Sequence, residues 1–213
     1  MRRGPVRVGI DGLGRAGWSI HADTLATLPD RFEVVAACDP DPRRRREAEQ
    51  RFGCRTYPSY QEMLGDHEIE VVAVASPSHL HTEHTLQALQ AGYHVLVEKP
   101  MAESLEAADR MIATARASGR LLSVNQNYRF RAGFMKVQEV MASGVLGCII
   151  QFRIAWHSFS RRWDWQTLKE YRGGLLNNSG AHVVDLALQL MGEGEVRVFS
   201  HMECTPNYAG DAE

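Results

Sequence analysis

The feature that most constrains the fold is a glycine cluster with the spacing G-x-G-x-x-G at residues 12–17. It directly follows a short β-branched run, 6–10, and opens a helical pattern, so it marks a tight connection from a strand to a helix. In a dinucleotide site of this kind Gly12 permits the turn, Gly14 lets the backbone approach the pyrophosphate, and Gly17 lets the helix pack closely on the strand. A glycine-rich turn that binds nothing is the alternative. The expected contacts to a dinucleotide are Gly12, Leu13, Gly14, Arg15 and Ala16.

An acidic residue at the end of the second apolar run supports the dinucleotide interpretation. Asp39 follows the run 33–38. It lies about 20 residues beyond the glycine cluster, where a carboxylate accepts hydrogen bonds from the adenosine ribose. Arg43 and Arg44 come next, and they are either the solvated start of a helix or ligands for the 2′-phosphate of NADP. The expected cofactor is therefore NAD or NADP, with Asp39 favouring NAD.

Short apolar runs alternate with longer helical patterns through residues 6–125, which is typical of βα units around a parallel sheet. Some helix ends are readable, because Ser59 with Glu62 forms a capping-box pattern and Ser104 precedes a helix that Gly119 ends. After residue 125 the pattern changes. We expect an α/β protein of two domains, 1–124 and 125–213. The expected strands are 6–10, 33–38, 71–75, 94–98 and 121–124 in the first domain and 148–156 and 196–202 in the second, where helices are expected at 134–143 and 180–191.

The composition narrows the class of protein. With 44% hydrophobic and 23% charged residues the chain is neither collagen-like nor largely disordered. A formal charge of −2 gives no general attraction to nucleic acid or to an anionic membrane, so the expected partner is a small molecule. Neither a signal peptide nor a membrane-spanning run is visible, and a cytoplasmic location is expected. Four cysteines without a C-x-x-C pair fit neither a zinc site nor a disulfide framework and suit a reducing compartment: Cys38, Cys54, Cys148 and Cys204.

Three histidines, His79, His81 and His84, follow the fourth apolar run in an H-x-H-x-x-H pattern that could supply ligands to zinc. No matching ligand cluster appears downstream, and the pattern comes directly after Ser76-Pro77 at the carboxyl end of an expected parallel strand. That edge is where doubly wound sheets bind their ligand. We therefore expect that these histidines bind no metal and that their segment lines the cofactor cleft. His84 is expected to be exposed.

The tripeptide Glu98-Lys99-Pro100 ends the next expected strand, again at the carboxyl edge. Lys99 is either a surface charge or, beside a nicotinamide, the group that takes the hydroxyl proton as hydride leaves the neighbouring carbon. That second role requires the pKa of Lys99 to fall from about 10.4 toward neutrality through burial or a cationic neighbour.

The expected helix 180–191 carries His182 and Asp185 on one face. They either satisfy each other in a buried position or face a polar substrate, and residue chemistry alone leaves both interpretations open. A group of aromatic and polar residues indicates a pocket with aromatic walls and a polar rim, of the kind that binds sugars: Trp156, His157, Trp163, Trp165 and Arg129. Aromatic packing between domains explains the tryptophans equally well.

Taken in order along the chain, these motifs resemble the Gfo/Idh/MocA family of NAD(P)-dependent oxidoreductases. The Glu98-Lys99-Pro100 tripeptide and the later glycine and His/Asp block are specific to it, whereas the glycine cluster is generic. The matching segments are 12–17, Asp39, Ser76-Pro77 with His81, Glu98-Lys99-Pro100, Asn127-Tyr128-Arg129-Phe130, and Gly173-Gly174 through His182 and Asp185.

The resemblance implies an N-terminal Rossmann domain with a doubly wound parallel sheet. A C-terminal α/β domain follows, whose open, mostly antiparallel sheet carries substrate on one face and often a partner subunit on the other. Typical substrates are sugars, inositols and related polyols. Lys99 and His182 correspond to catalytic positions, and Arg129, Trp165, Asn178 and Asp185 to substrate contacts. The implied cofactor contacts further along the chain are Ser76, Pro77, His81, Glu98, Lys99 and Asn127, besides Asp39, Arg43 and Arg44.

Two departures from the family pattern bear on activity. Asn178 stands where inositol-dehydrogenase-like members place an aspartate, and an amide accepts no proton at neutral pH. Family members are also substantially longer, so we expect a truncated chain with part of the C-terminal sheet missing. Alternatives are a non-catalytic NAD(P)-binding regulatory protein of the same fold, an inactive fragment, or reduction of an aldehyde, imine or tetrapyrrole on this fold.

Overall fold

The computed structural model describes residues 4–157 and 164–202. The chain divides into two compact units, residues 1–125 and 126–213. No helix among the described residues combines the length and the apolar character needed to span a bilayer.

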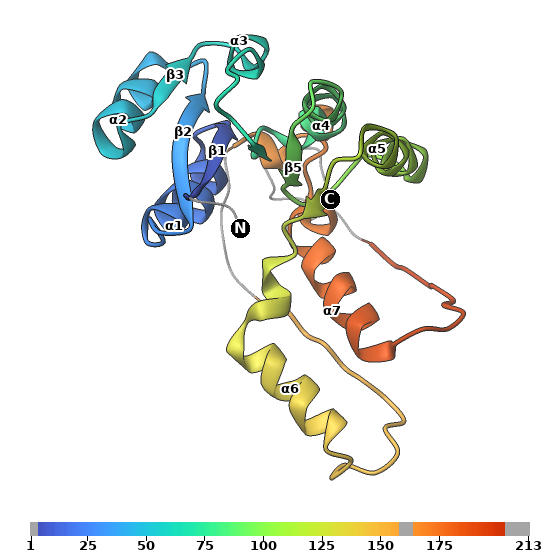
Figure 1. The fold of residues 1–213 in the computed structure, drawn as a ribbon. Helices are drawn as coiled ribbons and strands as arrows, with labels where there is room; N and C mark the ends of the chain where they lie inside the picture. Colours follow the sequence, from blue (N-terminus) through green and yellow to red (C-terminus); the bar gives the residue numbers. More distant parts are fainter. Residues whose placement is uncertain (1–3, 158–163, 203–213) are drawn as a thin grey trace. The chain divides into compact units, whose positions relative to one another are not determined.

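The first unit is built on a six-stranded, fully parallel sheet (Figure 1). The strand order is β3-β2-β1-β4-β5-β6. From β1 the chain adds strands first on one side, as β2 and β3, and then on the other, as β4, β5 and β6. The point between β1 and β4 where this order switches is where doubly wound sheets bind ligands. The strands are β1 (Val6–Asp11), β2 (Phe32–Cys38), β3 (Arg55–Tyr57), β4 (Val71–Val74), β5 (His94–Val97) and β6 (Leu122–Val124). The expected Rossmann-type parallel sheet is confirmed. Only β3 was missed, because a three-residue edge strand leaves almost no periodic signal.

Helices and helical turns connect these strands: η1 (Ala16–Ala22), α1 (Asp23–Ala26), α2 (Pro42–Phe52), α3 (Tyr60–Leu64), η2 (Ser78–Leu80), α4 (His81–Gln90) and α5 (Leu105–Ser118). Helices α3 and α5 start at the predicted caps, because Ser59 accepts from the Glu62 amide and Ser104 from the Ala107 amide. The first helix departs from expectation. It begins as a π-helical turn, η1, a geometry that often occurs at functional sites.

Two apolar clusters lie on opposite faces of the sheet. Val34 belongs to the cluster that includes Ala22 of η1 and Ala48 of α2. Its neighbour Val35 belongs to the cluster that includes residues of α3, α4 and α5. Because successive side chains of a strand point to opposite faces, this division shows a sheet covered by helices on both sides.

The regular elements described in the second unit are helices and helical turns: η3 (Asn127–Phe130), α6 (Ala132–Ala142), η4 (Trp165–Thr167), η5 (Lys169–Tyr171), η6 (Leu176–Gly180) and α7 (Ala181–Met191). The expected strands 148–156 and 196–202 are not formed, so the antiparallel sheet of this domain is not confirmed. A strand requires a hydrogen-bonded neighbour, and neither stretch has one among the described residues. Their apolar side chains are exposed, with Ile150 at 88% and Phe199 at 95%.

Candidate dinucleotide site and its surroundings

The glycine turn after β1 has the geometry that its three glycines predict. Gly12 has φ +89°, and a Cβ there would lie 2.9 Å from the Ala75 carbonyl oxygen. A Cβ on Gly17 would lie 1.7 Å from the Gly12 carbonyl oxygen, so helix and strand touch at this point. A Cβ on Gly14, in contrast, would meet no protein atom within 4 Å. The first and third glycines are therefore enclosed by protein, and the second leaves the backbone accessible to a ligand, as a pyrophosphate site requires.

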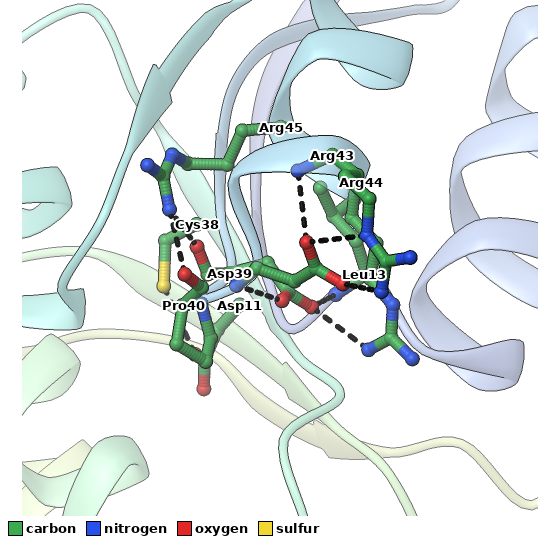
Figure 2. A network of polar contacts seen from close by, with 9 residues as sticks. Asp11, Leu13, Cys38, Asp39, Pro40, Arg43, Arg44 and Arg45 are labelled. Carbon is green, nitrogen blue, oxygen red and sulfur yellow. Dashed lines mark hydrogen bonds and ion pairs between the residues drawn. The ribbon is translucent and has the colours of Figure 1, made fainter.

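Asp39 ties the end of β2 to this turn (Figure 2). Its side chain is buried, and its Oδ2 accepts from the Leu13 amide at 2.9 Å and from Arg44 Nη1 at 3.3 Å. Its Oδ1 accepts from the Asp41 amide at 2.8 Å. A carboxylate accepts about four hydrogen bonds, so one position remains for a ribose hydroxyl. The acid predicted from its sequence position is thus joined directly to the turn it was expected to serve.

The arginines after Asp39 divide into different roles (Figure 2). Arg43 forms a bidentate pair with Asp41, with Nη2 at 2.9 Å from Oδ2, and its side chain is 79% exposed. This hydrogen bonding lowers the pKa of Asp41 to about 2. Arg44 contacts Asp39, whereas Arg45 donates to the Asp39 and Pro40 carbonyl oxygens. Of the two predicted cofactor contacts, Arg44 adjoins the acid, and the charge of Arg43 is taken up by Asp41.

The side chain of His81 lies between two segments at the carboxyl edge of the sheet and contacts both. Its buried ring lies between the Pro100 carbonyl oxygen, 2.7 Å from Nδ1, and the Ser76 carbonyl oxygen, 2.9 Å from Nε2. Burial lowers the pKa of this imidazole, and a neutral ring donates to one of the two carbonyls. His81 was predicted to contact the cofactor, but both of its ring nitrogens are engaged by protein carbonyls. It joins the Ser76-Pro77 segment to the Glu98-Lys99-Pro100 turn.

A buried acid, a half-buried imidazole and a buried hydroxyl occur together where β1 and β4 end: Asp11, His84 and Ser76. His84 Nδ1 lies 2.6 Å from Asp11 Oδ2 and 3.2 Å from Ser76 Oγ. In a catalytic triad the acid and the hydroxyl use different ring nitrogens, so this arrangement does not activate Ser76 as a nucleophile. Tyr60 stacks on the ring at 4.1 Å, and the expectation that His84 is exposed was wrong. Burial also raises the pKa of the neighbouring Cys38 thiol far above its ordinary value, which makes it unreactive.

The Glu98 carboxylate is held by residues that sequence reasoning missed. Glu98 Oε1 accepts from His21 Nε2 at 3.0 Å and from Asn125 Nδ2 at 2.7 Å, and its Oε2 accepts from the Lys99 amide at 3.3 Å. Burial on its own raises the pKa of Glu98, but the hydrogen bonds from His21 and Asn125 outweigh it, and the pKa lies below its ordinary value. The position of His21, four residues after Gly17 on the helix face that packs on the sheet, was the available signal. Lys99 is half-buried beside this group.

In the second unit, two predicted substrate contacts pair with each other. Arg129 Nε donates to Asp185 Oδ2 at 2.8 Å, and its Nη2 donates to the other oxygen, which joins η3 to α7. The ring of His182 stacks on Tyr128 at 4.0 Å, and Trp156 stacks on the same tyrosine at 5.1 Å.

The remaining predicted residues of this unit lie near its helical turns. Asn178 lies on η6, one turn before His182, and Trp165 begins η4. Asn127 begins η3, and its Oδ1 is buried without a protein hydrogen-bond partner among the described residues. Trp163 and Cys204 lie outside the described residues. No cluster of three potential metal-ligating side chains occurs in the described part of the chain.

Comparison with known proteins identifies the family. A model described as "Oxidoreductase family, NAD-binding Rossmann fold" matches residues 6–126, and the C-terminal domain model of the same family matches residues 134–213. The chain belongs to the Gfo/Idh/MocA family. The family resemblance inferred from the motifs is thereby confirmed.

Relatives within the Gfo/Idh/MocA family include dehydrogenases of sugars and inositols. D-glucoside 3-dehydrogenase of Escherichia coli is 35% identical over 199 residues, which cover 90% of this chain and 56% of that protein. Myo-inositol 2-dehydrogenase of Thermotoga maritima is 31% identical over 198 residues, covering 92% of this chain and 58% of that protein. The chain spans about half the length of the curated relatives it matches.

A solved structure in this group shows the same fold with ligands bound. The WlbA dehydrogenase from Bordetella pertussis, in complex with NADH and UDP-GlcNAcA, matches with a TM-score of 0.77 at 30% identity. The match covers 90% of this chain and 57% of that one.

Proposed function

We propose that this chain binds NAD(P) through its first unit and takes part in moving hydride between the nicotinamide and a secondary hydroxyl or ketone of a sugar, inositol or related polyol. The observation that carries the proposal is the Asp39 carboxylate bonded to the Leu13 amide, close in the chain to Gly14, where an added Cβ would meet no protein atom within 4 Å. The glycine turn and the ribose acid form one connected unit, which a bare structural turn would not require. The names of the sugar and inositol relatives support the substrate class.

We assign proton transfer to Lys99, beside the buried Glu98 carboxylate at the end of β5. When bound, the nicotinamide supplies the hydride acceptor. On oxidation, the Lys99 amine takes the hydroxyl proton as the electron pair of the C–H bond leaves with the hydride, so that the alcohol becomes a ketone. His182 is the second catalytic candidate, and Asn178, Arg129, Asp185 and Trp165 are candidates for orienting the substrate hydroxyls. Asn178 itself takes no proton, because it is an amide.

The expected preference is for NAD. A carboxylate at Asp39 accepts from the ribose diol and repels a 2′-phosphate. Arg44 already contacts this carboxylate at 3.3 Å and is the arginine that could turn to a 2′-phosphate, which keeps use of NADP open. Arg43 is committed to Asp41.

A cytoplasmic location and a homo-oligomer formed through the C-terminal domain complete the proposal. The oligomer is what the family resemblance implies, and the location is supported by the scattered cysteines, of which Cys38 and Cys54 are buried free thiols.

A second candidate is an NAD(P)-binding protein that senses the dinucleotide without turning it over. The Arg129–Asp185 pair favours this alternative, because two residues expected to bind substrate satisfy each other's charge.

The test begins with titration of the folded chain by NADH and by NADPH, followed by nicotinamide fluorescence. If neither binds, the dinucleotide assignment is refuted. If one binds, oxidation of a panel of cyclitols and sugars separates enzyme from sensor. For any substrate found, we expect Lys99→Met to retain NADH affinity and to lose about 10²- to 10⁴-fold in kcat, the range for general acid–base catalysis. A Lys99→Met variant with unchanged kcat would exclude the assigned role.

A further inference from the structure

A buried network of hydrogen bonds connects η1 to the backbone of Lys99. His21 of η1, Glu98 after β5 and Asn125 after β6 come from three separate segments. The His21 and Glu98 side chains are 6% and 7% exposed and are joined at 3.0 Å. Asn125 adds a bond of 2.7 Å to the same carboxylate oxygen. The network ends at the backbone amide of Lys99, which donates to the other carboxylate oxygen of Glu98, Oε2.

A buried carboxylate is costly unless donors satisfy it, and linking η1 to β5 would not require a charge. Apolar packing of similar volume joins such elements elsewhere in this unit. The ionisable groups that act on the Glu98 carboxylate are His21 from η1, His81 from α4, and Lys99 next to it in sequence. Asp11 acts on His81 from β1. Of these groups, Lys99 has a proposed chemical role.

We propose that His21 and Asn125 are positioning residues that hold the Glu98 carboxylate in place and ionised beside Lys99, so that its charge and its hydrogen bond to the Lys99 amide set the position and the proton affinity of the Lys99 amine. The inference deepens the proposed function and rests on the role assigned there to Lys99. The Glu98 carboxylate favours the protonated amine, which is the form that gives a proton to the ketone oxygen when the reaction runs toward the alcohol, and it opposes the fall in pKa that burial of Lys99 would produce.

The sequence makes a direct test practicable, because it contains only three lysines: Lys99, Lys136 and Lys169. Reductive methylation with ¹³C-formaldehyde labels their amines, and the signal lost in Lys99→Arg identifies Lys99. Its titration is then followed by NMR without cofactor or substrate. In Glu98→Gln we expect the Lys99 midpoint to fall by about one pH unit, the size of effect that an adjacent opposite charge produces.

Glu106→Gln is the matched control, because it makes the same charge change at an exposed position in the first turn of α5. The proposal is overturned if Glu98→Gln moves the Lys99 midpoint no further than Glu106→Gln does. Circular dichroism checks that both variants are folded.

His21→Leu tests whether His21 acts through Glu98. Leucine donates no hydrogen bond, so the Glu98 carboxylate loses its bond from η1, and we expect the Lys99 midpoint to fall toward its value in Glu98→Gln. In the Glu98→Gln background the same substitution should have no effect. An equal shift in both backgrounds would show that His21 does not act through Glu98.

A measurement on the unaltered chain keeps the proposal testable if Glu98→Gln fails to fold. With ¹³C-labelled glutamate, the Glu98 carboxyl should titrate below its ordinary value, in keeping with the lowered pKa. Titration above that value overturns the proposal. Since no ligand is present in these experiments, their failure is distinct from failure to bind NADH, which bears on the proposed function alone.

Discussion

Replacing Asp39 by asparagine removes one negative charge from the end of β2 with little change in volume. The carboxylate accepts from the backbone amides of Leu13 and Asp41 through different oxygens, and from Arg44. An amide side chain has only one acceptor oxygen, and its NH₂ group would face one of these backbone donors. Asp39→Asn therefore breaks at least one of the two backbone bonds and weakens the hold on the glycine turn.

The magnitude follows from the bond that a ribose hydroxyl would make. A hydrogen bond to a charged group contributes about 1.5–3 kcal/mol. At about 1.4 kcal/mol for each factor of ten, its loss weakens NADH binding by about 10- to 100-fold. For NADPH the electrostatic effect has the opposite sign, because the repulsion of the 2′-phosphate is removed and Arg44 is released from its pair. The preference should shift toward NADPH.

Fluorescence titration with both cofactors measures this change. The matched control is Arg43→Met, which alters a side chain that is 79% exposed and paired with Asp41, and it should leave NADH affinity unchanged. If Asp39→Asn remains folded and binds NADH as tightly as the unaltered chain, the assignment of Asp39 to the ribose is refuted.

Two further predictions follow from the same edge of the sheet. Gly17→Ala places a Cβ 1.7 Å from the Gly12 carbonyl oxygen, so we expect a large drop in Tm. Gly14→Ala should keep its Tm and lose NADH affinity. Equal losses of Tm in the two variants would contradict the different roles assigned to these glycines. Burial lowers the pKa of His81 below that of the unfolded chain, so the unfolded state binds more protons and the free energy of unfolding should fall as pH drops below about 6.5. Urea unfolding at pH 7 and pH 5 should show a smaller decrease for His81→Gln, and an unchanged decrease would exclude His81 as the cause.

The parts of this molecule that local sequence determines were predictable. The glycine turn, Asp39 and the caps at Ser59 and Ser104 are each defined by residues within a few positions, and all are observed. Asp39 was assigned by its distance from the turn, although its bond to the Leu13 amide was not foreseen.

What escaped prediction depends on contacts between distant segments. His21 and Glu98 are 77 residues apart, and only the packing of η1 on the sheet brings them together. The stretches 148–156 and 196–202 have the alternation of strands, but alternation indicates only the capacity to pair. The Arg129–Asp185 pair joins residues 56 positions apart, so each looked available for substrate when considered alone.

The bond between Asp39 and the Leu13 amide also bears on how quickly a ligand can be captured. Because both partners of this bond belong to the protein, the glycine turn is held in shape by the fold itself, and its loss of conformational freedom is incurred during folding. A preorganised turn of this kind should associate with NADH in one step at a rate limited by encounter, without a slow isomerisation afterwards. The Asp39 carboxylate would then both select the cofactor and keep the glycine turn in the conformation that binds it.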